Sequence, residues 1–267
     1  MNNTDLQTFT FKLTDDNSVG FFWKAKLLEN FNSKYQNIKV IQHPIFGKAL
    51  LLDDYVMFCE YDEHKYHELI SYPALSSLEK CSEVLVVGGG DTLTVKRLLS
   101  TNIEKVTMAE IDEDVFKICK KHFPNLLNDY LKDPRLNIIF DDAIKIIEEE
   151  KKYDLILLDI QDCRDQEMAS HVLFTEHFYS NCQKKLNKDG IMVAQISCPY
   201  LLPEHFDAQS KILKKLFKNT FIYGAYMHCY GMHQYFMACS DTISFNPVKI
   251  KEDINLKFDW DFTIFNN

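Results

Sequence analysis

Residues 83–91 read EVLVVGGGD, in which a continuous apolar run at 84–87 is followed by three glycines and an aspartate. An unbroken apolar run is typical of a β-strand that is covered on both faces. Glycines after such a strand let the backbone turn sharply and let a ligand approach the main chain. The pattern G-x-G-x-x-G fails because Leu93 occupies its sixth position, and Asp91 would repel a phosphate. The stretch therefore predicts a ligand-binding turn in an α/β fold and disfavours a pyrophosphate site.

From this strand onward, strand patterns alternate with helical ones. Further strands are expected at 105–109, 136–140, 155–158, 191–195, 221–226 and 234–239. Helices are expected between them at 92–100, 113–122, 143–150, 175–186 and 204–217. Such alternation predicts right-handed βαβ units and a doubly wound parallel sheet. Only a turn-sized gap separates the last two strands, so we expect them to pair antiparallel.

The chain before the glycine turn has a different pattern. Residues 9–57 contain short runs of aromatic and β-branched residues that are broken by turn signals, which predicts a small antiparallel unit. We expect a small N-terminal β domain at 1–60 and a Rossmann-like catalytic domain at 61–267. The predicted fold class is α/β, with a Rossmann-like sheet of the S-adenosylmethionine methyltransferase type and a small N-terminal antiparallel β domain.

The composition limits the kinds of partner. Lys and Arg number 30 against 39 Asp and Glu, and the resulting net charge of −9 argues against binding to nucleic acid. The eight cysteines include no C-x-x-C pair, so neither a disulfide framework nor a structural zinc site is expected. The sequence contains no secretory signal pattern and no apolar run of about 18 residues. We expect a cytoplasmic protein with no membrane partner.

Carboxylates follow the expected strands at the edge where open α/β sheets bind ligands. Glu110 comes about 20 residues after the glycine turn, where an acidic group can accept both ribose hydroxyls of a nucleoside. Asp142 begins a helix, so it serves either as a cap or as a ligand group. Asp159 and Asp162 follow another buried strand. Together with Asp91, these charges require a bound cation, either a metal ion or a polyamine beside a sulfonium nucleoside.

Motifs between residues 38 and 241 resemble those of the spermidine synthases. They are FGKALLLD at 46–53, EYDEHKYHEL at 60–69, VGGGD at 87–91, EID at 110–112, DD at 141–142, YD at 153–154, DIQD at 159–162 and VAQ at 193–195. Members of that family transfer an aminopropyl group from decarboxylated S-adenosylmethionine to an amine. The resemblance implies an aminopropyltransferase that acts on putrescine, needs no cofactor or metal, and forms a homodimer or homotetramer.

The resemblance also implies a donor half of the site. Glu110 would hold the ribose, and Asp142 with Ala143 would hold the adenine. The expected donor-binding residues are Gln36, Gly88, Gly90, Glu110, Asp142 and Ala143.

The other matching residues would handle the two amines. Asp91 would bind the ammonium of the aminopropyl group, and Asp162 the far ammonium of the diamine. Asp159 would be the proton acceptor, because an alkylammonium must lose a proton before it can attack carbon. The acceptor end would be lined by Tyr66, His67 and Tyr230.

Two alternatives stay open on the sequence. A methyltransferase could use the same adenosyl half-site, but would have little need for Asp91 or for paired aspartates. A polyamine-binding protein without catalysis is the other, because Cys163 and residues 164–170 stand where the family has a proline and a Gly/Pro loop. Thr92 and Leu93 likewise replace two glycines that usually follow the turn aspartate.

Overall fold

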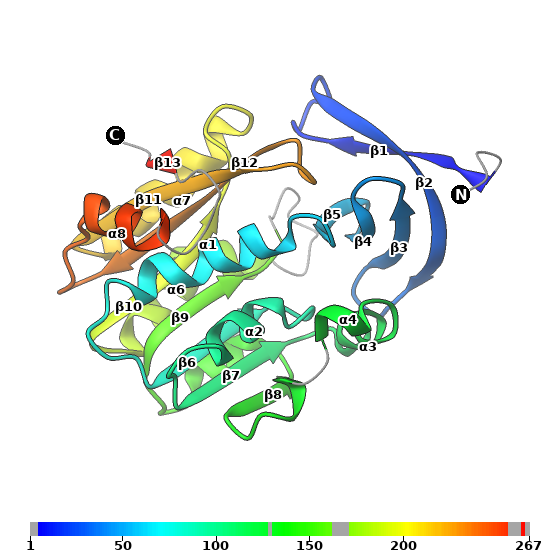
Figure 1. Ribbon diagram of the computed structural model, residues 1–267. Coiled ribbons are helices and arrows are strands. Elements are labelled where there is room, and N and C mark those ends of the chain that lie inside the picture. Colours follow the sequence, from blue (N-terminus) through cyan, green and yellow to red (C-terminus); the bar gives the residue numbers. More distant parts are fainter. Residues whose placement is uncertain (1–4, 128–129, 162–170, 256–262, 265–267) are drawn as a thin grey trace.

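A computed structural model describes residues 5–127, 130–161, 171–255 and 263–264 of the chain, which form two sheets (Figure 1). The smaller sheet has antiparallel strands in the order β1-β2-β3-β4-β5. Their bounds are Gln7–Lys12 for β1, Gly20–Asn32 for β2, Asn37–His43 for β3, Gly47–Leu52 for β4 and Tyr55–Cys59 for β5. Alternate residues of β2, such as Trp23 and Ala25, are buried, as expected for a sheet with one covered face.

The larger sheet carries the order β13-β11-β12-β10-β9-β6-β7-β8. Its strands are β6 Glu83–Gly88, β7 Lys105–Glu110, β8 Leu136–Phe140, β9 Tyr153–Asp159, β10 Leu186–Ile196, β11 Asn219–Met227, β12 Met232–Ser240 and β13 Thr263–Ile264. Strands β6 to β10 run parallel, whereas β12 pairs antiparallel with both β10 and β11. The predicted mixed sheet, closed by a late antiparallel hairpin, is confirmed.

Helices cover both faces of this sheet. They are α1 Glu63–Leu75, α2 Leu93–Leu99, α3 Glu113–His122, α4 Pro124–Leu127, α5 Ala143–Glu148, α6 Glu176–Lys184, α7 Pro203–Leu216 and α8 Pro247–Asn255. Val84 and Val86 of β6 pack in the same cluster as α1 and α2, whereas Leu85 and Val87 pack with α5, α6 and α7. The central strands therefore read as unbroken apolar runs because both of their faces are buried. Among the described helices, none combines the length and the apolar character needed to cross a lipid bilayer.

The strand register brings the candidate residues to one edge of the sheet. Gly88 at the end of β6 lies beside Asp159 at the end of β9, and Glu110 ends the neighbouring strand β7. A third apolar cluster joins strands β3, β4 and β5 to α3, so the small sheet packs beside this edge (Figure 1). Ligand-binding residues can thus reach the edge from both sheets.

Candidate active site

A cavity of about 410 Å³ opens where the ends of β6, β7 and β9 meet the N-terminal sheet and the β11–β12 connection. Its described lining contains five carboxylates and one lysine, namely Asp53, Asp91, Glu110, Asp142, Asp159 and Lys12. Low-dielectric walls that carry charge of one sign attract ligands of the opposite sign. The cavity therefore suits a cationic ligand.

The glycine turn shapes the floor of this cavity. Gly88 and Gly89 have φ angles of +77° and +71°, which favour glycine. A Cβ atom on Gly88 would lie 2.2 Å from the carbonyl oxygen of Asp159, so a side chain does not fit there. The N–H of Gly89 donates to that same oxygen at 2.8 Å. The turn thereby ties β6 to the end of β9 and places Asp91 and Asp159 on one cavity wall.

Thr92 continues the turn with φ +66°, a left-handed conformation that is unusual for a β-branched residue. Its hydroxyl donates to the carbonyl oxygen of Asp91 at 2.6 Å and lies 2.9 Å from the hydroxyl of Tyr130. These contacts help to hold the conformation. Helix α2 begins one residue later than predicted, at Leu93, because Thr92 is still part of the turn.

Glu110 lies buried at the end of β7 and lines the cavity. Its Oε1 accepts a hydrogen bond from the N–H of Asp112 at 2.8 Å. A Cβ atom on Gly90 would lie 2.9 Å from Oε2, so the third glycine leaves room for the carboxylate. Burial raises the pKa of Glu110 to about 7, and the charges of Asp112 and Asp91 add to this although N–H donors oppose it.

Gln36 reaches the cavity from the small sheet. Its Nε2 donates to Oδ2 of Asp112 at 2.8 Å, and the hydroxyl of Ser33 donates to the same oxygen at 2.6 Å. Asp112 also caps α3 by accepting from the N–H of Asp114. One buried aspartate therefore anchors the N-terminal segment beside Glu110, a contact that sequence spacing does not reveal.

Asp142 and Ala143 both line the cavity at the start of α5. The side chain of Asp142 caps the helix by accepting from the N–H of Ile144 at 2.9 Å. The capping interpretation from the sequence is thus present in the structure. Because the same residue faces the cavity, a contact with a ligand is compatible with the cap.

Asp159 is held by two hydroxyl groups at the end of β9. Its Oδ1 accepts from the hydroxyl of Tyr66 at 2.9 Å, and its Oδ2 accepts from the hydroxyl of Thr94 at 2.6 Å. Burial raises the pKa of Asp159, and the charge of Asp91 raises it further, against the opposing effects of His67 and the two hydroxyl groups. A carboxylate with a raised pKa is a better proton acceptor near neutral pH.

Tyr66 links Asp159 to a second polar group. Its hydroxyl also lies 2.5 Å from Oε1 of Gln195, which lines the same cavity. A hydroxyl carries one proton, so it can donate a hydrogen bond to Gln195 while it accepts one from a protonated Asp159. Neither Gln195, which belongs to the VAQ motif, nor Thr94 was predicted from the sequence to belong to the site. Their positions depend on strand pairing and on the packing of α2, for which the sequence carries no spacing signal.

His67 was expected to line the acceptor end of the cavity. In the structure Asp91 lines the cavity in its place, and His67 lies behind Asp91. It is absent from the described lining, and its Nε2 lies 3.6 Å from Oδ1 of Asp91. Its Nδ1 lies 3.0 Å from Oε2 of Glu63, and Arg97 holds the same carboxylate. Burial disfavours the charged imidazole, but Asp91 and Glu63 outweigh burial and raise the pKa of His67 to about 10. Tyr66, its neighbour on α1, takes the place on the wall.

Replacing His67 by Gln is expected to lower the free energy of unfolding by about 3–5 kcal/mol at pH 7, because it leaves Asp91 without its cationic partner and Glu63 with Arg97 alone. The stabilisation by His67 is complete below its ordinary pKa of 6.5 and is lost as the pH rises through about 10. Urea unfolding at pH 7 and pH 10 measures both effects. His64→Gln, on the same helix and partly exposed, is the matched control. Equal stability of the His67 and His64 variants would contradict the assigned ion pair.

Tyr230 closes the cavity from the β11–β12 connection. Its hydroxyl donates to the carbonyl oxygen of Met57, and its ring meets that of Tyr66 edge to face at 6.3 Å between centroids. Asp162, Cys163 and residues 164–170 lie outside the described residues. The expected role of Asp162 toward the diamine therefore stays a prediction.

Part of the lining comes from the N-terminal hairpin, whose sequence gives no sign of a role in the site. Phe11, Lys12, Leu13 and Phe21, near the β1–β2 hairpin, reach the cavity, as does Tyr35. Their aromatic and β-strand pattern indicates a sheet but not which cavity the hairpin covers. Only the packing of the two sheets determines this contact.

The family-model comparison matches the spermine/spermidine synthase domain over residues 63–250. A curated polyamine aminopropyltransferase of Prochlorococcus marinus subsp. pastoris is 34% identical over 242 residues, which covers 89% of this chain and 84% of the relative. Another, from Clostridium botulinum, is 35% identical over 224 residues, which covers 81% of this chain and 76% of the relative.

Solved structures give the same result for the fold. A spermidine synthase in complex with the transition-state analogue AdoDATO has a TM-score of 0.84 and 26% identity, covering 97% of this chain and 88% of its own. The spermidine synthase from Thermotoga maritima has a TM-score of 0.82 and 25% identity over 97% of this chain and 87% of its own. The similarity extends across both sheets of the structure.

Proposed function

Because the chain belongs to the spermine and spermidine synthase family of polyamine aminopropyltransferases, we propose that it transfers the aminopropyl group of decarboxylated S-adenosylmethionine to putrescine. The products are spermidine and methylthioadenosine. The observation that carries the proposal is the placement of Glu110, Asp91 and Asp159 around one acidic cavity. A nucleoside, an ammonium group and an amine that must lose a proton each require one of these carboxylates.

The donor half of the proposed complex uses the glycine turn and the end of β7. Glu110 accepts the ribose hydroxyls, while Asp142 and Ala143 flank the adenine. Gly88 and Gly90 line the cavity, and their lack of a side chain lets Asp159 and Glu110 pack directly against the turn. Asp91 binds the ammonium of the aminopropyl group. Methylthioadenosine lacks this group, and S-adenosylhomocysteine carries its ammonium on an amino-acid chain instead.

The acceptor half centres on Asp159. A protonated amine has no free lone pair, so Asp159 must remove a proton before the nitrogen can attack. A new N–C bond then forms as the C–S bond breaks, and the electron pair of that bond neutralises the sulfonium. The proton on Asp159 can be shared with the hydroxyl of Tyr66, which donates onward to Gln195. Alignment of the two reactants in the cavity supplies further acceleration.

We further propose that the reaction needs no cofactor besides the donor co-substrate. The sulfonium is already a good leaving group, so neither a metal ion nor a general acid is required at sulfur. A cytoplasmic homodimer or homotetramer is proposed from the family resemblance.

Product analysis tests the proposed function. The purified chain is incubated with decarboxylated S-adenosylmethionine and with putrescine, cadaverine, agmatine or spermidine in parallel. We expect methylthioadenosine and spermidine in equal amounts, with putrescine the best acceptor. If the only reaction detected were methyl transfer from S-adenosylmethionine to an amine, with release of S-adenosylhomocysteine, the chain would be a methyltransferase. Calorimetric binding of both ligands without any product would indicate a polyamine-binding protein.

Donor binding is expected to weaken at acidic pH. The Glu110 pKa of about 7 in the free protein means that its carboxylate becomes protonated below pH 7 and loses an acceptor for the ribose. The apparent affinity then falls by about tenfold per pH unit, in proportion to the ionised fraction. Calorimetry with methylthioadenosine between pH 5.5 and 8 measures this, because that ligand stays uncharged. Glu110→Gln should bind weakly at every pH, and an identical slope in that variant would contradict the assignment.

A further inference from the structure

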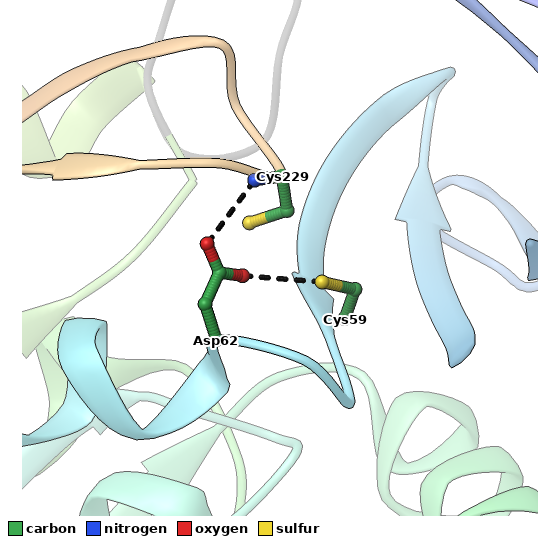
Figure 2. Close-up of side chains that lie close together, drawn as sticks. All are labelled: Cys59, Asp62 and Cys229. Carbon is green, nitrogen blue, oxygen red and sulfur yellow. Dashed lines mark hydrogen bonds between the residues drawn. The ribbon is translucent and has the colours of Figure 1, made fainter. Parts of the chain in front are cut away.

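A second group of chemically reactive side chains lies outside the cavity, between the two sheets. Cys59 ends β5, Asp62 precedes α1, and Cys229 lies in the connection between β11 and β12 (Figure 2). All three residues are buried, with exposed fractions of 0%, 1% and 3%. One ligand atom from each, two sulfurs and a carboxylate oxygen, lies within 4.8 Å of the others.

The carboxylate of Asp62 is fixed by backbone groups. Its Oδ2 accepts from the N–H of His228 at 2.7 Å and from the N–H of Cys229 at 3.2 Å. Its Oδ1 accepts from the thiol of Cys59 at 3.1 Å, and Figure 2 shows this oxygen turned toward that sulfur. Backbone bonds to one oxygen orient the other oxygen toward the thiols. Outer-shell hydrogen bonds of this kind orient the carboxylate ligands of metal ions.

A fourth donor is within reach. Nδ1 of His228 lies 3.5 Å from Oδ2 of Asp62. The imidazole is partly exposed and meets the rings of Tyr61 and Tyr226 edge to face, with centroids 5.5 Å and 5.4 Å away. In the structure this nitrogen is not part of the group of ligand atoms that lie within 4.8 Å of one another, so the imidazole has to turn toward the sulfurs to complete the site.

We propose that Cys59, Asp62, Cys229 and His228 bind a structural zinc ion. Thiolate and imidazole groups are the ligands that zinc prefers, whereas magnesium and calcium prefer all-oxygen sets. Four protein ligands complete a tetrahedral shell and leave no position for a substrate, as in structural sites. Two thiolates, one carboxylate and Zn²⁺ sum to a single negative charge, which is far less costly to bury than three uncompensated anions.

The site would join elements that are distant in the sequence. Asp62 and Cys229 are 167 residues apart, so no clustered ligand motif marks them, and the sequence-based expectation of no zinc site is replaced by this proposal. The ion would tie the N-terminal sheet and α1 to the β11–β12 connection, whose next residue is Tyr230. This role is independent of the reaction proposed above.

Metal titration of the full-length chain tests the proposal. After chelation, Co²⁺ is added as a spectroscopic substitute, and zinc content is measured by mass spectrometry after Zn²⁺ loading and gel filtration. We expect one ion per chain, thiolate-to-cobalt charge-transfer bands in the near ultraviolet, and a higher melting temperature with Zn²⁺. Cys59→Ser and Cys229→Ser should each weaken zinc binding by about 100-fold or more, because a structural site divides a large binding free energy among its four ligands.

The matched control is Cys81→Ser, a cysteine at intermediate exposure outside the cluster, which should bind zinc as the unchanged chain does. If the Cys59 or Cys229 variant does not fold, the cobalt spectrum of the unchanged chain is by itself the test of the zinc proposal. The absence of charge-transfer bands would overturn the proposal. Unchanged zinc binding in folded Cys59→Ser and Cys229→Ser variants, or a disulfide between these two cysteines in freshly purified protein, would also overturn it.

Discussion

Replacing Asp159 by Asn should lower kcat by about 10²–10⁴-fold, the range expected when a general base is lost. The amide has nearly the same shape, and its one oxygen can still accept from the hydroxyl of Tyr66 or Thr94, but it cannot accept the proton of an ammonium group. The affinity for methylthioadenosine should change little, because the donor contacts assigned to Glu110 remain. Single-turnover product formation and calorimetric binding separate these two effects.

Asp141→Asn is the matched control for this variant. Asp141 precedes α5, is partly exposed, and pairs with Lys145 at 2.7 Å instead of lining the cavity. Its replacement should leave turnover unchanged. Turnover of Asp159→Asn within tenfold of the unchanged enzyme would contradict the role of Asp159 as proton acceptor.

Replacing Asp91 by Asn should lower kcat/KM for decarboxylated S-adenosylmethionine by about 30-fold or more, equivalent to about 2 kcal/mol, the lower end for removing one partner of a buried charge pair. Asp91 would bind the ammonium of the aminopropyl group, and the asparagine retains the oxygen that accepts from the N–H of Leu93. Methylthioadenosine lacks that ammonium, so its affinity should stay nearly the same. Steady-state kinetics with the donor and calorimetry with methylthioadenosine measure the difference.

Glu110→Gln serves as the comparison, because a different pattern of binding losses is expected for it. It should weaken the binding of the donor and of methylthioadenosine alike, because both carry the ribose. If Asp91→Asn weakened methylthioadenosine as strongly as the donor, Asp91 would act on the whole turn and not on the ammonium. That result would contradict its assignment.

The sequence was sufficient to predict the part of the site that follows from local order along the chain. A buried strand, a glycine turn and an acidic residue about 20 positions later determine where a parallel sheet presents its ligand groups. Gly88, Glu110 and Asp159 do lie at one edge because parallel strands end together. The antiparallel pairing of β11 and β12 followed from the short gap between them.

The remainder depends on packing between distant segments. Tyr66 and His67 are adjacent on α1, and only the angle at which the helix meets the sheet decides that Tyr66 faces the cavity. Lys12 enters the lining because the β1–β2 hairpin covers the edge of the larger sheet. Cys59 and Cys229 meet where the two sheets join, without any signal in their spacing.

A crystal structure of the Asp159→Asn variant with both decarboxylated S-adenosylmethionine and putrescine tests the central claim most directly. We predict the ribose on Glu110, the aminopropyl ammonium on Asp91, and one putrescine nitrogen within about 2.6–3.2 Å of the residue 159 side chain, in line with the carbon next to sulfur. A donor whose ammonium points away from Asp91, or a diamine bound outside this cavity, would contradict it.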